Sequence, residues 1–96
     1  MHNKSMEIEF DARKAHTNQK KHGVSFDEAV SSMLDRNALA IEDPDSENEA
    51  RWILVGLSYR QRLLTVIYTI REEQTIRLIS ARKSTKKECG YYAQRI

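Results

Sequence analysis

Residues 76–88 read IRLISARKSTKKE, a strand-like run that passes into the start of a helix. Side chains of a strand point alternately to its two faces, so we expect Ile76, Leu78 and Ser80 on one face and Arg77 on the other. Five cations occupy this short span: Arg77, Arg82, Lys83, Lys86 and Lys87. Their clustering favours a phosphate-binding surface. The alternative for any single arginine is a solvated position on an open sheet face.

Turn and periodicity signals around this stretch predict an α+β fold in the order β-α-α-β-β-β-β-α. The elements are expected at about residues 6–10, 12–21, 26–34, 39–41, 51–58, 62–70, 75–82 and 86–92. The last strands follow one another through short turns, which predicts an antiparallel meander. Residues 62–70 carry apolar side chains on both faces, as in a central strand that is covered twice. We therefore expect a compact antiparallel sheet flanked by helices.

Local capping signals mark the three helices. Asp11 offers a side-chain oxygen to the free amides of the first helix, and Gly23 ends that helix. Ser25 and Glu28 have the spacing of a capping box for the second helix, and Thr85 opens another before the last helix. Helical spacing in the second helix predicts a buried stripe made of Phe26, Ala29, Val30, Met33 and Leu34.

Length and composition indicate one globular domain of residues 6–96 after a tail of residues 1–5. The chain has 96 residues, of which 40% are hydrophobic and 31% charged, and it has no apolar run long enough to span a bilayer. Its start lacks the features of a secretory signal. A lone cysteine, Cys89, fits a reducing cytoplasm, and the spacing of His, Cys and carboxylates predicts no metal site and no cofactor.

The net charge of +2 hides an asymmetry between the two halves of the chain. Residues 1–50 hold six Lys or Arg and eleven acids, a net charge of −5, whereas residues 51–96 hold ten and three, a net charge of +7. A basic half of this kind is typical of proteins that bind a polyanion such as RNA. Docking of an acidic protein is the alternative, and charge alone does not separate the two.

Lys21 and His22 stand together where the first predicted helix ends, just before Gly23. The negative end of a helix dipole favours His22 as a cation. Two roles remain open for this pair: a merely favourable interaction with the helix dipole, or a part in acid–base chemistry near neutral pH.

The chain resembles the BrnT toxins of bacterial type II toxin–antitoxin systems. The resemblance runs from Phe10 to Tyr92, and it is carried above all by KHGVSF at residues 21–26 and ISARK at residues 79–83, with Glu49 and Arg51 between them. It implies a fold like that of the RelE ribonucleases and an RNA-cleaving toxin that halts translation. It also implies a small antitoxin, BrnA, with a ribbon-helix-helix part that binds operator DNA, so the toxin would meet DNA only through that complex.

Metal-independent cleavage of RNA needs a base for the 2′-hydroxyl proton, cations for the charge that builds on phosphorus, and an acid for the leaving oxygen. We predict that Arg62, Arg77 and Arg82 hold the scissile phosphate together. His22 is the best candidate for the acid or the base, and Lys21 or Glu88 would be substitutes. Further RNA contacts are expected from Lys83, Lys86, Tyr68 and Tyr91, although a core or interface position is the alternative for both tyrosines.

A different class of function remains open at this stage. The chain could bind RNA or the ribosome without cleaving it. The two hypotheses differ in their response to His22→Ala, which a binding module should tolerate and which a nuclease that uses His22 should not.

Overall fold

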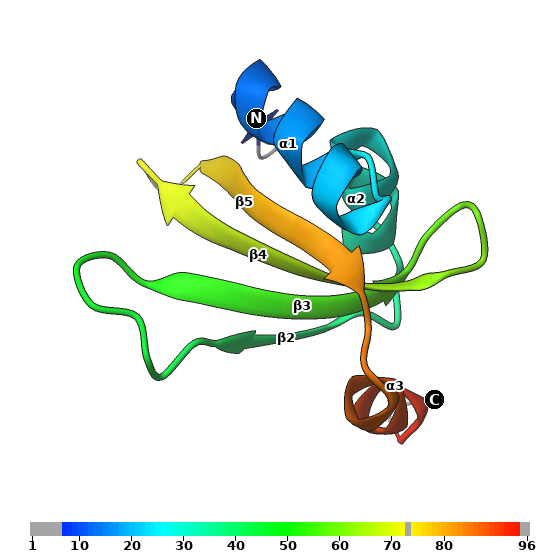
Figure 1. Ribbon diagram of the computed structural model, residues 1–96. Coiled ribbons are helices and arrows are strands. Elements are labelled where there is room, and N and C mark those ends of the chain that lie inside the picture. Colours follow the sequence, from blue (N-terminus) through cyan, green and yellow to red (C-terminus); the bar gives the residue numbers. More distant parts are fainter. Residues whose placement is uncertain (1–6, 73, 95–96) are drawn as a thin grey trace, which may run out of the picture.

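The computed structural model describes residues 7–72 and 74–94. Five strands form one sheet in the order β1-β5-β4-β3-β2, with α1 and α2 on one face and α3 against the other (Figure 1). In chain order the elements are β1 (Glu7–Glu9), α1 (Ala12–His22), α2 (Phe26–Met33), β2 (Leu39–Glu42), β3 (Arg51–Leu57), β4 (Leu63–Arg71), β5 (Thr75–Lys83) and α3 (Lys86–Ala93). The α+β class and the predicted element order are confirmed, and β4 is the central strand.

The sheet is mixed rather than wholly antiparallel. Strands β2 to β5 form the predicted antiparallel meander. The first strand, β1, instead pairs in parallel with β5, with Ile8 opposite Ile76. No local turn connects these two strands, so no short-range sequence signal announces their pairing.

A β-bulge in β5 changes the face to which its second half points. Ile67 of β4 pairs with Ser80, but the next residue, Tyr68, pairs with Leu78, so Ile79 is an extra residue. Ser80 therefore shares a face with Ile67, and Ala81 turns into the core beside Leu78. The expectation that Ser80 and Leu78 lie on one face is wrong, because strict alternation assumes an unbroken ladder.

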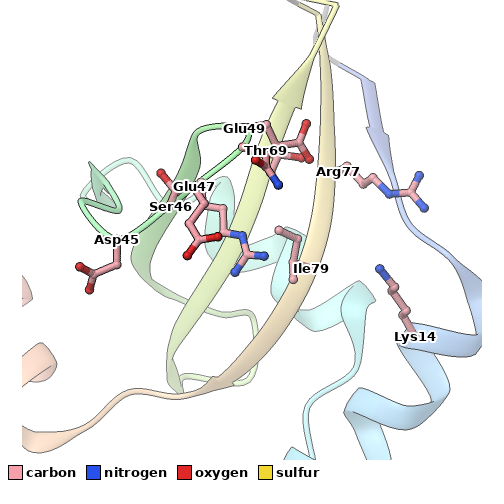
Figure 2. Close-up of a pocket in the computed structure, with 10 residues that line it drawn as sticks. Lys14, Asp45, Ser46, Glu47, Glu49, Thr69, Arg77 and Ile79 are labelled. Atoms are coloured by element: carbon pink, nitrogen blue, oxygen red, sulfur yellow. The ribbon is translucent and has the colours of Figure 1, made fainter.

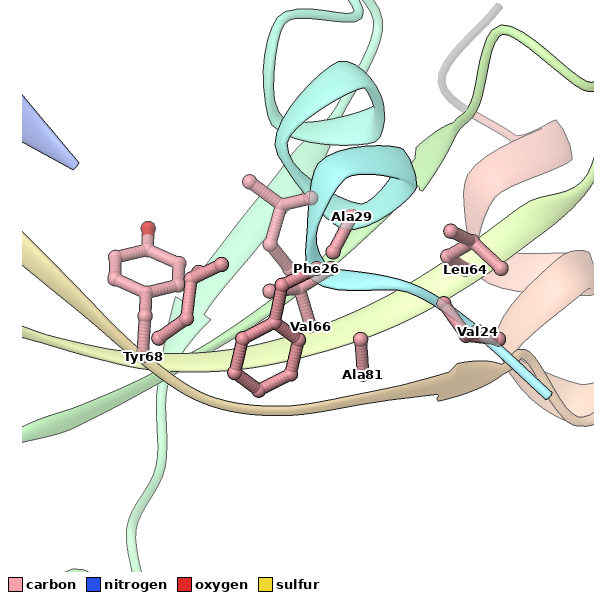
Figure 3. Packing of buried hydrophobic residues seen from close by; sticks show 9 residues of the cluster. Val24, Phe26, Ala29, Leu64, Val66, Tyr68 and Ala81 are labelled. Atoms are coloured by element: carbon pink, nitrogen blue, oxygen red, sulfur yellow. The ribbon is translucent and has the colours of Figure 1, made fainter. Parts of the chain in front are cut away.

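The main core lies between α2 and the sheet. Figure 3 shows Phe26 and Ala29 of α2 against Val66, with Leu64 and Tyr68 along the same strand. Close contact between α2 and β3 needs Gly56, because a Cβ at this position would overlap the backbone carbonyl oxygen of Ser32. The predicted buried stripe of α2 is correct at Phe26 and Ala29 but wrong at its end. Leu34 follows the helix and is 76% exposed.

The three predicted N-caps form. The side chains of Asp11, Ser25 and Thr85 accept hydrogen bonds from the first amides of α1, α2 and α3, and Gly23 ends α1 in the left-handed conformation at φ 69°. The capping box is complete at α3. At α2 it is only half formed, because the Glu28 side chain turns toward β4 instead of the cap. None of the described helices is long and apolar enough to cross a membrane.

Side-chain hydrogen bonds attach each outer helix to the sheet. Asn18 of α1 is buried, and its amide nitrogen donates to the backbone oxygen of Ala81 at 2.9 Å while its oxygen accepts from the Ala81 amide at 3.0 Å. Asn18 thus takes the place of a neighbouring strand at the edge of β5. On the other face, the Tyr92 hydroxyl of α3 donates to Asp35 at 2.5 Å, and the same carboxylate oxygen accepts from the Leu57 amide of β3 at 2.8 Å.

Candidate functional site

A pocket with a cavity volume of about 450 Å³ lies where three strands carry polar residues at paired positions (Figure 2). Arg51 of β3 pairs with Thr69 of β4, and Thr69 pairs with Arg77 of β5. Ile79 adds an apolar side chain to the lining, which Lys14 of α1 and the segment 45–49 extend on either side. Pairing between the strands therefore brings together cations that lie far apart in the sequence.

A tight turn shapes the acidic segment beside the pocket. The Asp43 side chain accepts from the Asp45 amide at 2.9 Å, and the Asp43 amide donates to the backbone oxygen of Arg51 at 2.7 Å. This Asx turn fixes the chain at the point where it leaves β2. It brings Glu47 and Glu49 to the pocket lining, so carboxylates and cations line the same cavity.

The cations of the pocket differ in whether a carboxylate already forms an ion pair with them. The Arg77 guanidinium lies 3.2 Å from a carboxylate oxygen of Glu9 on the neighbouring β1. Arg51 and Lys14 are exposed, and neither forms an ion pair with any residue in the described part of the chain. Arg51 and Lys14 are therefore the cations most available to an anionic ligand.

Thr69 carries a polar group that lacks a partner. The residue is 1% exposed and lines the pocket between the two arginines, and its hydroxyl makes no hydrogen bond within residues 7–72 and 74–94. A buried hydroxyl without a partner is unfavourable by about 1–3 kcal/mol, so such groups call for an explanation. The hydroxyl oxygen is closed to solvent in this structure, so a ligand oxygen would supply the missing partner only by displacing the side chains that cover it.

Arg62 is held by a buried ion pair at the opposite end of the sheet. Its guanidinium donates to both carboxylate oxygens of Glu28, which is 1% exposed, and to the Gly23 backbone oxygen at 3.2 Å. The Ser58 hydroxyl also donates to Glu28, at 2.7 Å. Hydrogen bonding by Arg62 holds the pKa of Glu28 below its usual value in spite of burial, which acts in the opposite direction.

Arg82 likewise forms an ion pair, with a glutamate of α3. Its two terminal nitrogens donate to the two oxygens of Glu88 at 2.7 and 2.8 Å, a forked pair, and Thr65 donates to Glu88 at 2.9 Å. The hydrogen bonds from Arg82, with further ones from Thr85 and Thr65, lower the pKa of Glu88 to about 2. Arg82 therefore docks the start of α3 on the sheet, and Glu88 is not a free proton acceptor near neutral pH.

The structure separates the arginines that were predicted to hold one phosphate. Arg77 lies opposite Thr69, whereas Arg62 precedes Leu63, the first residue of β4. Six residues of strand separate Thr69 from Leu63, or about 20 Å. A single phosphate cannot touch both arginines, so the prediction that Arg62, Arg77 and Arg82 hold one phosphate is wrong. Lys21, His22 and Lys83 belong to the Arg62 end, where the Asn18–Ala81 hydrogen bonds fix α1 beside β5.

The tyrosines occupy different environments. Tyr68 is buried in the main core, and burial raises its pKa, so it is not available to stack on an RNA base in this fold. Tyr91 on α3 is half exposed, and Lys86 in the first turn of α3 is exposed. Their predicted contacts with RNA remain predictions.

Sequence reasoning missed most of the pocket as a site, namely Lys14, Glu47, Glu49, Arg51 and Thr69. The hairpin pairing places Arg51 opposite Thr69, and this register could have been read from the turn at residues 59–61. The contribution of α1 and of the acidic segment has no such local signal. Within the described residues, no group of three or more His, Cys, Asp or Glu side chains is placed to hold a metal ion.

Comparison with known proteins identifies the family of this chain. The model of a family described as "Ribonuclease toxin, BrnT, of type II toxin-antitoxin system" matches residues 10–88. The chain is thus an endoribonuclease toxin by class. It belongs to the BrnT family, and membership of a type II system implies an antitoxin partner.

One solved structure supports the fold independently. The 1.1 Å crystal structure of the Brucella abortus ribonuclease toxin BrnT matches with a TM-score of 0.59 and 23% sequence identity, over 85% of this chain and 100% of that chain. At this identity the likeness shows the fold alone. A search of curated proteins found no match.

Proposed function

We propose that this toxin cleaves RNA without a metal ion, in the pocket between Arg51 and Arg77, and thereby inhibits translation. The observation that carries the proposal is the buried Thr69 hydroxyl, which has no partner in the described chain and lies between two arginines at the pocket. A phosphate oxygen would accept from this hydroxyl and from the guanidinium groups. Forked, permanently charged donors suit a phosphate and the charge that builds on it in the transition state.

The pocket also supplies groups for proton transfer. In the proposed reaction the Glu49 carboxylate takes the 2′-hydroxyl proton, and the 2′-oxygen attacks phosphorus. The bond from phosphorus to the 5′-oxygen breaks, and Lys14 gives that oxygen a proton. The products are a 2′,3′-cyclic phosphate and a 5′-hydroxyl. This assignment replaces Lys21 and His22 as acid and base, and it leaves Arg62 and Arg82 to hold the framework through Glu28 and Glu88.

The test is cleavage of mixed-sequence RNA in EDTA by the wild-type chain and by Glu49→Gln, with mass spectrometry of the product ends. We expect cyclic phosphate ends from the wild type and a rate lower by about 10²–10⁴-fold for Glu49→Gln, because a general base is lost. Glu47→Gln is the matched control and should stay close to the wild-type rate.

Four results would contradict the proposal. Loss of wild-type cleavage on addition of EDTA would show a metal requirement. Products with 5′-phosphate ends would show that the 2′-oxygen is not the nucleophile. A wild-type rate for Glu49→Gln would remove the proposed base, and a folded chain that binds free RNA without cutting it would favour a binding role or a need for the ribosome.

We further propose that the antitoxin is of the BrnA type, with a ribbon-helix-helix part, and that operator DNA is bound only through the complex. The family match and the motifs at residues 21–26 and 79–83 support this partner. The net charge of +7 on residues 51–96 would steer an acidic segment of the antitoxin to the toxin. A bacterial cytoplasmic location fits an RNA target and the single cysteine, Cys89.

A further inference from the structure

A second basic surface lies at the far end of α1 and β5 from the pocket. It consists of Lys21, His22 and Lys83, and we call it the distal basic surface. The hydrogen bonds between Asn18 and Ala81 fix its position. His22 follows Asn18 by one helical turn and Lys83 follows Ala81 by two strand residues, so each of the two continues the face on which its element contacts the other.

Both elements also carry a cation at the pocket. Lys14 of α1 and Arg77 of β5 line it. On α1, Lys14 and Lys21 are seven residues apart, two helical turns on the same side and about 10 Å along the axis. On β5, the partners of Arg77 and Lys83 are Thr69 and Leu64, five residues apart on β4 or about 17 Å. Lys83 shares the helix-covered face of Leu64, whereas Arg77 shares the opposite face with Thr69, so 17 Å is the smallest separation of the two cations. Lys14 joins the two faces, because it lines the pocket with Arg77 and lies on the same side of α1 as Lys21.

The charge of the distal basic surface is not neutralised locally. Lys21 and Lys83 are exposed, and neither has an ion-pair partner within residues 7–72 and 74–94. The two arginines at this end, Arg62 and Arg82, are paired with Glu28 and Glu88. Free positive charge at this end therefore comes from Lys21 and Lys83, together with the exposed Lys86 and Lys87 at the start of α3. Ammonium groups suit the sugar–phosphate backbone as sequence-independent point charges.

We propose that the distal basic surface binds phosphates of the same RNA strand that is cleaved in the pocket, several nucleotides away from the cleaved bond. Stacked nucleotides advance about 3.4 Å per step along one strand, so 17 Å corresponds to about five steps, which join six nucleotides. The preferred substrate is then a single RNA strand of about six nucleotides or more. This proposal rests on the proposed cleavage pocket for the position of the cut.

The test is the binding of 2′-O-methyl RNA, which lacks the attacking hydroxyl, measured by fluorescence anisotropy between 0.05 and about 0.3 M NaCl. Strands of three and twelve nucleotides are compared on the wild type and on Lys21→Gln/Lys83→Gln. Glutamine keeps most of the side-chain length, both positions are exposed, and circular dichroism verifies the fold. Arg36→Gln, which removes an exposed cation outside both sites, is the control.

For a single strand, each phosphate contact contributes about −0.7 to the slope of log affinity against log salt. We expect the double variant to reduce the magnitude of the slope for the twelve-nucleotide strand by about 1.4. With equal affinities at 1 M salt as the reference, the variant then binds this strand about 25-fold more weakly than the wild type at 0.1 M salt. Binding of the three-nucleotide strand should be unchanged. Arg36→Gln should leave both slopes as in the wild type.

Two outcomes would overturn the proposal. An unchanged slope for the long strand would show that no phosphate lies on the distal basic surface. An equal loss for both strands would show that Lys21 and Lys83 act at the cleaved phosphate itself. If the variant binds long RNA normally but loses affinity for the antitoxin, the surface serves an acidic protein instead. None of these outcomes depends on cleavage. Failure of this proposal is therefore distinguishable from failure of the proposed reaction, because the chemical identity of the product ends tests the reaction separately.

Discussion

Replacement of Arg62 by methionine should destabilise the toxin strongly while leaving its chemistry intact. The guanidinium of Arg62 is the main partner of Glu28, a carboxylate that is 1% exposed. Removing one partner of a buried ion pair typically lowers the free energy of unfolding by about 3–5 kcal/mol, because a charge remains buried without compensation. The Ser58 hydroxyl stays at 2.7 Å and the exposed Arg60 at 3.8 Å, so we expect the lower end of this range, about 3 kcal/mol.

The pH dependence of this loss follows from the pKa of Glu28. In the wild type, hydrogen bonding by Arg62 holds this pKa below the ordinary 4.5. The stabilisation is therefore fully present above pH 4.5 and is lost as the pH falls through the folded-state pKa. In Arg62→Met the carboxyl can be protonated more easily. The difference in unfolding free energy between the two proteins should be largest at pH 7 and should shrink below pH 4.5.

Urea denaturation at pH 7 and at pH 4 measures both effects, and a double variant isolates the cause. Glu28→Gln/Arg62→Met keeps an acceptor for Ser58 and buries no charge, so it should be more stable than Arg62→Met alone. A loss below about 1 kcal/mol at pH 7, or a loss of equal size at both pH values, would refute the reasoning. At a temperature where Arg62→Met stays folded, its RNA cleavage should match the wild type. A large fall in the rate would instead restore Arg62 to the catalytic site.

Three further predictions concern the framework. Tyr92→Phe removes a hydrogen bond to a carboxylate and should lower the free energy of unfolding by about 1.5–3 kcal/mol, measured by urea denaturation; an unchanged value would mean that this contact does not anchor α3. Gly56→Ala should lower the free energy of unfolding by about 1–3 kcal/mol, because the new methyl group overlaps a carbonyl oxygen of α2; a thermal midpoint equal to that of the wild type would contradict the close approach. Glu88→Gln should lower stability at pH 7 by about 1–3 kcal/mol after allowance for solvent screening, since the pKa of Glu88 is held at about 2; this stabilisation should persist down to pH 4.5 and disappear toward pH 2, and a deficit still present at pH 2 would argue against the ion pair.

The parts of the fold that sequence predicts well are those determined by neighbouring residues. Asp11 and Thr85 cap their helices as expected, and Gly23 ends the first one. Strong turn signals also placed strands β2 to β5 and their antiparallel pairing. Each of these features depends on a few residues in sequence, so local propensity decides them.

The parts that sequence missed depend on contacts between distant residues. The bulge at Ile79 reverses the face of Ser80, and nothing in the strand pattern indicates the extra residue. Glu28 has the spacing of a capping box, but a buried pair with Arg62 takes its side chain instead. The three arginines predicted to hold one phosphate are likewise separated, because Arg77 lies about 20 Å from Arg62 along the sheet. Each of the three is paired with a glutamate.

The location of the chemistry is the central claim, and one pair of variants tests it most directly. We would measure single-turnover cleavage of a short RNA in EDTA by Arg51→Gln in the pocket and by His22→Gln on the distal basic surface, each verified as folded. We expect Arg51→Gln to lower the rate by about 10²–10³-fold, as for loss of one donor to a developing negative charge, and His22→Gln to retain the wild-type rate. The reverse result would move the reaction to the end of α1 and contradict the pocket as the site of cleavage.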